Sequence, residues 1–164
     1  MIALQITELK AFMGKLLGTD TFDDFLLQEA TLQMGISYVI DGHINKAFYD
    51  TDEDTSATDD RSSFLPYGEV RGTLFDLIKG KRTPLGFQVV LQLSPKRCAI
   101  IFPEGLEKHF IKGLLLNIRY DGSKAMITSG ISYFAFTPDK APELIWDEAL
   151  MSFLRNAGIS FEQL

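Results

Sequence analysis

The sequence predicts an α+β fold in which two or three amphipathic helices pack on one face of an antiparallel β-sheet. Several segments place apolar residues at every second position, and the turn pairs Asp41-Gly42 and Asp121-Gly122 follow strand-like runs. Helix-like segments are fewer and do not alternate regularly with the strands, as they would in a series of βαβ units. We expect either one curved sheet or a sheet built in two parts.

The first helix is expected at about residues 7–17, after a short strand in MIALQI. Its apolar stripe has spacings of three and four, in Leu9, Phe12, Met13, Leu16 and Leu17. Thr7 is a suitable N-cap because its hydroxyl can accept from an amide one turn later. Gly18 is suited to the left-handed position that often ends a helix.

The following segment, FLLQEATLQM, is predicted to be a strand from Phe25. Strict alternation places one set of side chains on the same face, namely Leu26, Gln28, Ala30, Leu32 and Met34. Gly35 is expected to turn the chain into a hairpin with ISYVI. A further short strand is expected from His43 to Tyr49.

A second helix is predicted in YGEVRGTLFDLIKG, with Gly72 weakening it and Gly80 ending it. Alternation in GFQVVLQL predicts the next strand, and the segment Cys98–Phe102 is expected to be its partner strand. A short helix is expected between Pro103 and Lys112.

The remaining chain predicts a hairpin followed by a helix. GLLLNIRY and AMITSGISYFAF alternate on either side of Asp121-Gly122, with Gly130 as a bulge position. Pro142 is suited to the first turn of the final helix. The core-facing stripe of that helix is expected to hold Trp146, Leu150, Phe153 and Leu154, with Ile145 and Ala149 beside it.

Length and composition favour one globular domain over residues 1–164 in the cytoplasm. The chain has 1 cysteine, Cys98, which excludes an internal disulfide and favours a reducing compartment. We expect Cys98 to be a buried, inert thiol. The N-terminal residues lack the pattern of a signal peptide, and no apolar run is long enough for a membrane helix.

An acidic loop at about residues 50–63 interrupts the pattern, and we expect it to be mobile. Asp50, Asp52 and Asp54 have the spacing of the first ligands in a calcium loop. Thr55 stands where that loop needs glycine, and Arg61 stands where it needs glutamate. We therefore favour a solvated loop over a metal site, and the alternative is a weak cation site.

Basic residues gather on both sides of the GFQVVLQL strand. Lys79, Lys81 and Arg82 follow the second helix, and Lys96 and Arg97 follow the strand. Cations at the C-terminal end of a helix are stabilised by its dipole, which is a sufficient structural reason for the first three. The alternative is that all five bind an anion or a nucleic acid.

Aromatic residues flank the acidic loop on both sides, in Phe48, Tyr49, Phe64 and Tyr67. They either fix the ends of the loop to the core or form a docking surface for a partner protein. We assign no catalytic residue, because the sequence lacks GxGxxG, Walker, HExxH and GxSxG motifs. No cofactor is expected.

Six stretches that span nearly the whole chain resemble an uncharacterised bacterial family, a domain of unknown function. They are LKAFMGKLL, FLLQEA, YVIDG, LIKGKRTP, LNIRYDGS and IWDE. The resemblance implies a discrete folded bacterial protein and transfers no site residue. The order of the expected elements also resembles one domain of a DNA sliding clamp, which implies two helices on one face of curved antiparallel sheets.

These observations favour a non-enzymatic cytoplasmic interaction domain that binds another macromolecule, either a different protein or a second copy of itself. The alternative is a nucleic-acid-associated module with a clamp-like domain. An enzyme of unrecognised type is the third hypothesis.

Overall fold

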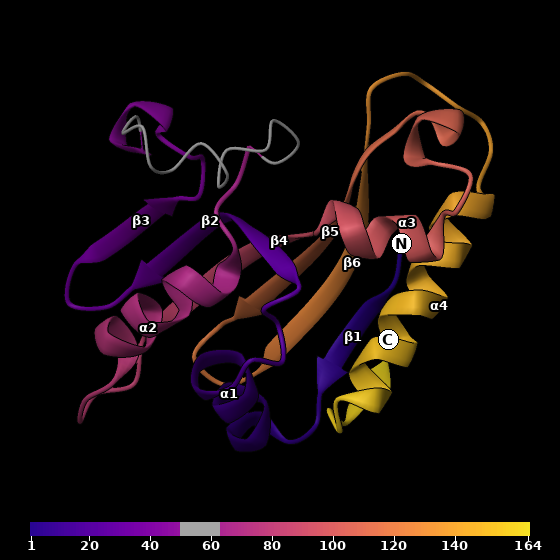
Figure 1. The fold of residues 1–164 in the computed structure, drawn as a ribbon. Coiled ribbons are helices and arrows are strands. Elements are labelled where there is room, and N and C mark those ends of the chain that lie inside the picture. Colours follow the sequence, from indigo (N-terminus) through magenta and orange to yellow (C-terminus); the bar gives the residue numbers. More distant parts are fainter. Residues whose placement is uncertain (50–62) are drawn as a thin grey trace.

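The computed structural model describes residues 1–49 and 63–164. Figure 1 shows the arrangement of its helices and strands. In chain order these are β1 (Ala3–Ile6), α1 (Leu9–Gly18), β2 (Phe25–Gln33), β3 (Ser37–Asp41), the 3-10 helix η1 (Lys46–Tyr49), α2 (Tyr67–Ile78), β4 (Gly86–Leu93), α3 (Pro95–Ile101), the 3-10 helix η2 (Leu106–His109), β5 (Ile111–Tyr120), β6 (Ala125–Tyr133), α4 (Ala141–Asn156) and β7 (Phe161–Gln163).

The strands form one open antiparallel sheet of 7 strands in the order β3-β2-β4-β5-β6-β1-β7. The predicted α+β class is therefore confirmed. The sheet is a single sheet, and the described residues contain 4 α-helices where two or three were expected. The extra helix is α3, which lies in the segment predicted as a strand.

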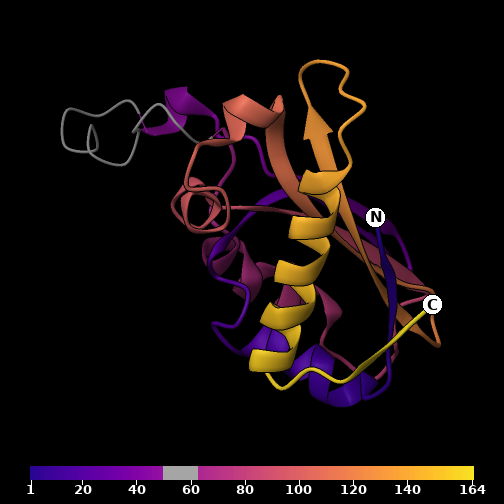
Figure 2. The same ribbon diagram turned by 90° about the vertical axis from the view of Figure 1, so that its right-hand side faces the viewer.

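The hydrophobic core lies between the helices and one face of the sheet. One row of buried side chains crosses five paired strands, namely Ala30, Val89, Ile118, Ile127 and Leu4. Buried residues of all four α-helices belong to the same cluster. Figure 2, turned by 90°, brings α4 to the front with the sheet beside it. Within residues 1–49 and 63–164, no helix covers the opposite face of the sheet, and most of the side chains on that face are polar or partly exposed.

A β-bulge in β2 changes which of its residues face the core. Leu27 pairs with Leu91 and Glu29 pairs with Val90, so Gln28 is an extra residue in the ladder. Phe25 and Leu27 point to the core before the bulge, and Ala30 and Leu32 do so after it. Strict alternation from Leu26 to Met34 was therefore wrong for the first half of the strand.

The segment predicted as a strand at Cys98–Phe102 is helical. Ser94 is the N-cap of α3 and Pro95 is in its first turn, where a proline needs no hydrogen-bond donor. Cys98 is buried and free, as expected. Its thiol lies 3.5 Å from the carbonyl oxygen of Leu93.

Several local predictions differ from the structure. Thr7 was predicted as the N-cap of α1, but the N-cap is Glu8, which makes no side-chain cap hydrogen bond. The amide of Thr7 donates to the carbonyl oxygen of Ser160, just before β7. Gly18 lies inside α1, and its backbone is not left-handed. Gly130 pairs regularly with Leu115, and the irregularity lies at Ile111/Gly113 on β5.

The region after β3 is short and irregular where a strand was expected. His43 makes an isolated bridge with Phe64, and η1 follows. Gly42 is required at the preceding position, because a Cβ there would lie 1.8 Å from the carbonyl oxygen of Leu27.

Candidate functional site

The five basic residues predicted as an anion site form two separate groups. Lys79, Lys81 and Arg82 lie between α2 and β4, whereas Lys96 and Arg97 lie in the first turn of α3, beyond the other end of β4. Eight residues of extended strand span roughly 26 Å, so one ligand phosphate cannot contact both groups.

Two of these cations are already paired. Lys79 lies 3.1 Å from Asp76 and over the ring of Phe75, and the Nε atom of Arg97 lies 3.5 Å from Asp24. Lys81, Arg82 and Lys96 are exposed and have no ion pair within residues 1–49 and 63–164. The structure therefore offers at most a small basic turn after α2.

Three of the four predicted aromatic residues lie around one cavity of about 340 Å3. Phe48 is 81% exposed and contacts the ring of Tyr49. Phe64 lies against the imidazole of His43, with ring centroids 4.5 Å apart. Tyr67 is completely buried, so the predicted exposed partner surface cannot include it. Its hydroxyl donates to the carbonyl oxygen of Leu16.

His43 also contacts Asp41 beside this cavity. The Nδ1 atom lies 2.6 Å from an Asp41 oxygen, which also accepts from the backbone amide of His43. These hydrogen bonds hold the pKa of the Asp41 carboxyl below its usual range. Both side chains are largely exposed to solvent, so their remaining hydrogen-bonding atoms need no partner within the protein.

The acidic loop, with Asp50, Asp52 and Asp54 as ligands of the alternative weak cation site, lies outside the described residues apart from Ser63. Within residues 1–49 and 63–164, no cluster of three or more histidine, cysteine, aspartate or glutamate residues could hold a metal ion.

A hydrophobic groove lies where α3 meets α4, and we name it the α3–α4 groove. It encloses about 290 Å3 and is lined by Asp24, Phe25, Leu93, Arg97, Ile100, Ile101, Trp146, Ala149, Ser152, Phe153 and Asn156. The apolar residues come from β2, β4 and both helices, and Trp146 at its base is almost fully buried. The sequence produces this groove because α4 carries a wider apolar stripe than the core requires.

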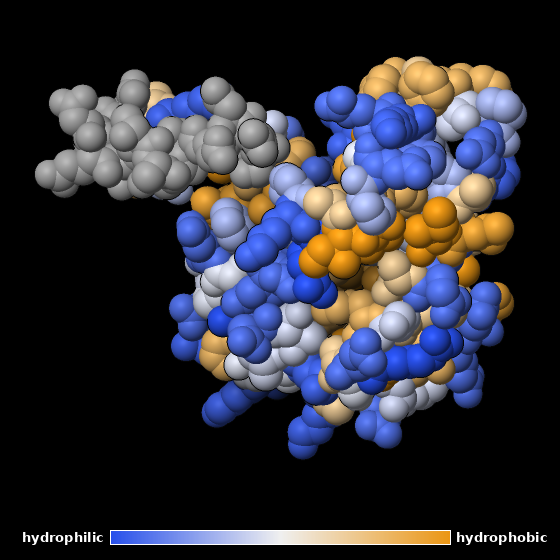
Figure 3. Space-filling view, turned by 45° about the vertical axis from the view of Figure 1, so that its right-hand side comes forward, coloured by the Kyte–Doolittle hydropathy of each residue, from blue (hydrophilic) through white to orange (hydrophobic). Residues whose placement is uncertain are grey.

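Two aliphatic side chains of the walls are exposed. Ile100, which lines the groove, is 64% exposed, and Ile145, one turn before the lining residue Ala149 on α4, is 42% exposed. Figure 3 shows hydrophobic surface gathered around a hollow in this region. A contiguous apolar surface is unusual on a protein that acts alone, and it is typical of sites that bind other molecules.

One end of the groove is acidic. Asp24 and Phe153 also line a neighbouring hollow that contains Asp20 and Asp23. Asp23 is paired with Arg71 and Asp24 with Arg97. Asp20 has no ion pair among the residues that the structure describes, so this end keeps a net negative charge.

Sequence reasoning missed this groove for two reasons. The strand prediction for Cys98–Phe102 hid the helix that forms one wall, although Ser94-Pro95 is a recognisable helix start. Ile145 was expected beside the core, but its side chain is 42% exposed.

Phe134 and Phe136, just after β6, were not among the predicted site residues, although Phe136 is 93% exposed.

Comparison with known proteins places the chain in a family. The model of a family of unknown function (DUF5721) matches residues 15–162. The chain belongs to the DUF5721 family. No curated protein and no solved structure matches this DUF5721 protein, so the resemblance to a sliding clamp is not confirmed.

The family assignment brings no activity, substrate or partner with it. In the described part of this DUF5721 protein, no helix has both the length and the apolar character needed to cross a membrane.

Proposed function

We propose that this DUF5721 protein is an interaction module that binds an amphipathic helix of a partner protein in the α3–α4 groove. The observation that supports the proposal is an apolar cavity whose lining residue Ile100 is 64% exposed, with Ile145 exposed on α4 one turn before the lining residue Ala149. Covering an aliphatic side chain of this kind completely contributes roughly 1.5–3 kcal/mol. These two partly exposed side chains therefore offer a useful part of the free energy that binding needs.

The shape of the groove favours a helix as the occupant. Two helices form its walls, and a helix lying between them would present side chains at spacings of three and four to the cavity. Ile100 on one wall and Ile145 on the other would then contact the same apolar stripe.

The charge around the groove favours a basic partner over a second copy of this chain. Asp20 adds a negative charge at one end that no ion pair within residues 1–49 and 63–164 offsets. A second copy would bring its own acidic residues to this surface. A Lys- or Arg-flanked helix would instead be attracted to it.

The two separate groups of basic residues make a nucleic acid a weaker candidate. A nucleic-acid interface needs a continuous basic surface along the phosphate backbone. Lys79, Lys81 and Arg82 together form only a small basic surface.

A cytoplasmic location is part of the proposal. Cys98 is free and buried, and a chain with 1 cysteine needs no oxidising compartment.

Fluorescence of Trp146 gives a direct test. It is the only tryptophan of the chain and lines the groove. The probe is a synthetic amphipathic peptide of leucine and lysine residues, titrated into the protein. We expect a saturable change in emission, and Ile100→Ser and Ile145→Ser should each weaken binding about tenfold, or ~1.4 kcal/mol.

The matched control is Ile36→Ser, which removes an isoleucine as exposed as Ile100 from the turn between β2 and β3, at the opposite end of β2 from the groove residue Phe25. Binding to this variant should be unchanged. Absence of saturable binding, or equal weakening by Ile36→Ser, would reject the proposal. Thermal melting of each variant checks that it is folded.

A further inference from the structure

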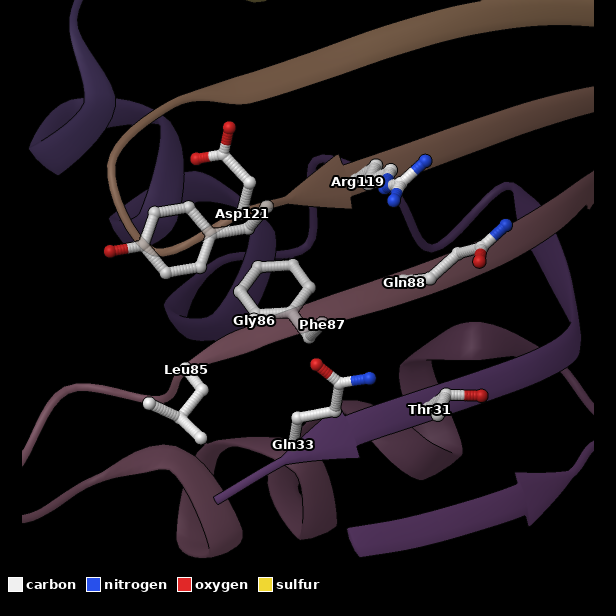
Figure 4. Close-up of a pocket in the computed structure, with 9 residues that line it drawn as sticks. Thr31, Gln33, Leu85, Gly86, Phe87, Gln88, Arg119 and Asp121 are labelled. Carbon is white, nitrogen blue, oxygen red and sulfur yellow. The ribbon is translucent and has the colours of Figure 1, made fainter.

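We propose that a second site, on the uncovered face of the sheet, binds the anionic group of a small carboxylate- or phosphate-bearing molecule. We name it the sheet-face pocket and define it by Thr31, Gln33, Gly86, Gln88, Arg119 and Asp121. Figure 4 shows these side chains on three neighbouring strands. The pocket has a volume of about 320 Å3, which is enough for a small metabolite-sized ligand.

The strand register places the polar side chains of the pocket in one row. Thr31 of β2 pairs with Gln88 of β4, and Gln88 pairs with Arg119 of β5. Paired residues point to the same face of a sheet, so the hydroxyl, the amide and the guanidinium are neighbours. Figure 4 shows Gln88 and Arg119 extending from adjacent strands toward the same end of the pocket.

Gly86 lines the pocket without adding a side chain to it. It pairs with Gln33, and a Cβ at this position would lie 2.9 Å from the carbonyl oxygen of Tyr120. The backbones of β4 and β5 therefore approach closely here, which disfavours a larger residue at position 86.

Arg119 provides an anion partner that the protein does not use. It is exposed and forms no ion pair or side-chain hydrogen bond within residues 1–49 and 63–164. A guanidinium offers five donors in a planar fork that matches the two oxygens of a carboxylate or phosphate. The residues that follow Arg119 across the strands in this row, Gln88, Thr31 and Met126, are uncharged. Asp121 lies two positions further along β5 and contributes a carboxylate to the same pocket.

The amide and hydroxyl groups can complete the contact. The Nε2 atom of Gln88 donates to the Oδ1 atom of Asn117 at 3.0 Å, which fixes the orientation of the Gln88 side chain. The side chains of Thr31 and Gln33 have no hydrogen-bond partner in the described part of the chain. Both can therefore donate to a ligand without breaking an existing bond.

Asp121 lies at the other end of the pocket and determines what else the ligand should carry. Its Oδ1 atom accepts from the amides of Ser123 and Lys124, and these bonds lower the pKa of the carboxyl. In Figure 4 its carboxylate and the Arg119 guanidinium lie apart. A ligand with an oxyanion at one end and a hydroxyl or amino donor at the other fits this arrangement.

This site is independent of the α3–α4 groove. The helices that form the groove pack on the core face of the sheet, whereas Gln88 and Arg119 are exposed on the opposite face. Variants of one site therefore leave the other intact, and failure of one proposal can be recognised separately from failure of the other.

A titration followed by 1H–15N NMR tests the proposal with two probes, inorganic phosphate and malate. Malate supplies carboxylates together with a hydroxyl, so the two probes distinguish a phosphate-bearing from a carboxylate-bearing ligand. We expect saturable shifts of the Gln88 and Arg119 amides and of the Gln33 side-chain NH2 with at least one probe. Arg119→Gln should weaken binding at least tenfold, and Arg119→Lys should weaken it less.

The matched control is Lys112→Gln, which removes one positive charge from the same strand outside the pocket. It should leave the affinity for the probe unchanged. Absence of saturable shifts with both probes overturns the proposal, and so does an equal loss in the Arg119→Gln and Lys112→Gln variants. Arg119 is exposed, so the folded state of its variants is readily confirmed from the dispersion of the same spectra.

Discussion

The hydroxyl of Tyr67 donates a hydrogen bond of 2.8 Å to the backbone carbonyl oxygen of Leu16. Leu16 lies in the last turn of α1, where carbonyl groups have no acceptor role within the helix. Tyr67, the first residue of α2, thus provides a hydrogen-bond donor for a carbonyl group at the end of α1. This buried hydrogen bond holds the two helices together. Of the two alternatives given for the aromatic residues beside the acidic loop, Tyr67 fits the one in which the ring is fixed to the core, and this bond explains why it is inside.

Tyr67→Phe should reduce the free energy of unfolding by about 1–3 kcal/mol, because it leaves a buried carbonyl oxygen without a donor. Urea denaturation measures this change. The matched control is Tyr133→Phe, because the Tyr133 hydroxyl is buried and has no hydrogen-bond partner in the described structure. That variant should be neutral or slightly more stable, and equal destabilisation by both substitutions would contradict the assignment.

Gly72→Ala should stabilise the protein by about 0.5–1 kcal/mol, because Gly72 lies inside α2 and alanine favours a helix. A Cβ at Gly72 meets no atom within 4 Å. Gly42→Ala should instead be severely destabilising, because its Cβ would overlap the Leu27 carbonyl. Comparison of the two melting temperatures checks both outcomes, and a stable Gly42→Ala variant would show that the β2 bulge can move.

Stability should fall between about pH 9 and pH 11, because burial raises the pKa of the Cys98 thiol from 9.0 to about 11. In this range the unfolded chain has lost the thiol proton and the folded protein keeps it, so rising pH favours unfolding. The contribution is roughly 2 kcal/mol. Cys98→Ala should have a smaller loss of stability across this range, whatever its stability at pH 7, and an unchanged slope would contradict the cause.

Ser129→Ala should reduce the free energy of unfolding by about 2–3 kcal/mol, because Ser129 donates to the buried carboxylate of Asp147. Its hydroxyl oxygen also accepts from the amide of Ile2 at 2.9 Å. The substitution therefore leaves that amide without this acceptor, and among the residues that the structure describes the Asp147 carboxylate keeps only its ion pair with the N-terminal ammonium group. Ser132→Ala is the control on the same strand, where the side chain makes no such bonds and the effect should be small. Thermal or urea unfolding of both variants measures the difference.

The elements that sequence reasoning predicted well have strong local signals. The β4 segment alternates without interruption, Asp121-Gly122 fixes the turn between β5 and β6, and Pro142 fixes the start of α4. In each case the side-chain pattern and the turn residues favour the same element, and the tertiary contacts favour it too.

The errors come from contacts that are distant in sequence. The bulge at Gln28 depends on how β2 pairs with β4, and the residues of β2 alone do not indicate it. The segment of α3 is rich in apolar residues that occur in both strands and helices, so its apolar pattern does not distinguish the two. The signal that distinguishes them is local: Ser94 and Pro95 begin the helix. β7 has only 3 residues and exists because β1 is beside it.

The candidate sites were harder to predict than the fold. The basic residues are close in sequence, but an extended strand separates them in space. Arg119 was noticed only as one position in an alternating strand, because its neighbours Thr31 and Gln88 come from other segments. A site composed of three strands becomes visible only when the register is known.

The position of β1 has a consequence for synthesis of the protein. Its partner strands are β6, at residues 125–133, and β7, at residues 161–163. At about 5–20 residues per second, β1 must wait on the order of ten seconds after its own synthesis before β6 is made. During that time Leu4 and Ile6, which are buried in the folded protein, lack the strands beside which they are covered.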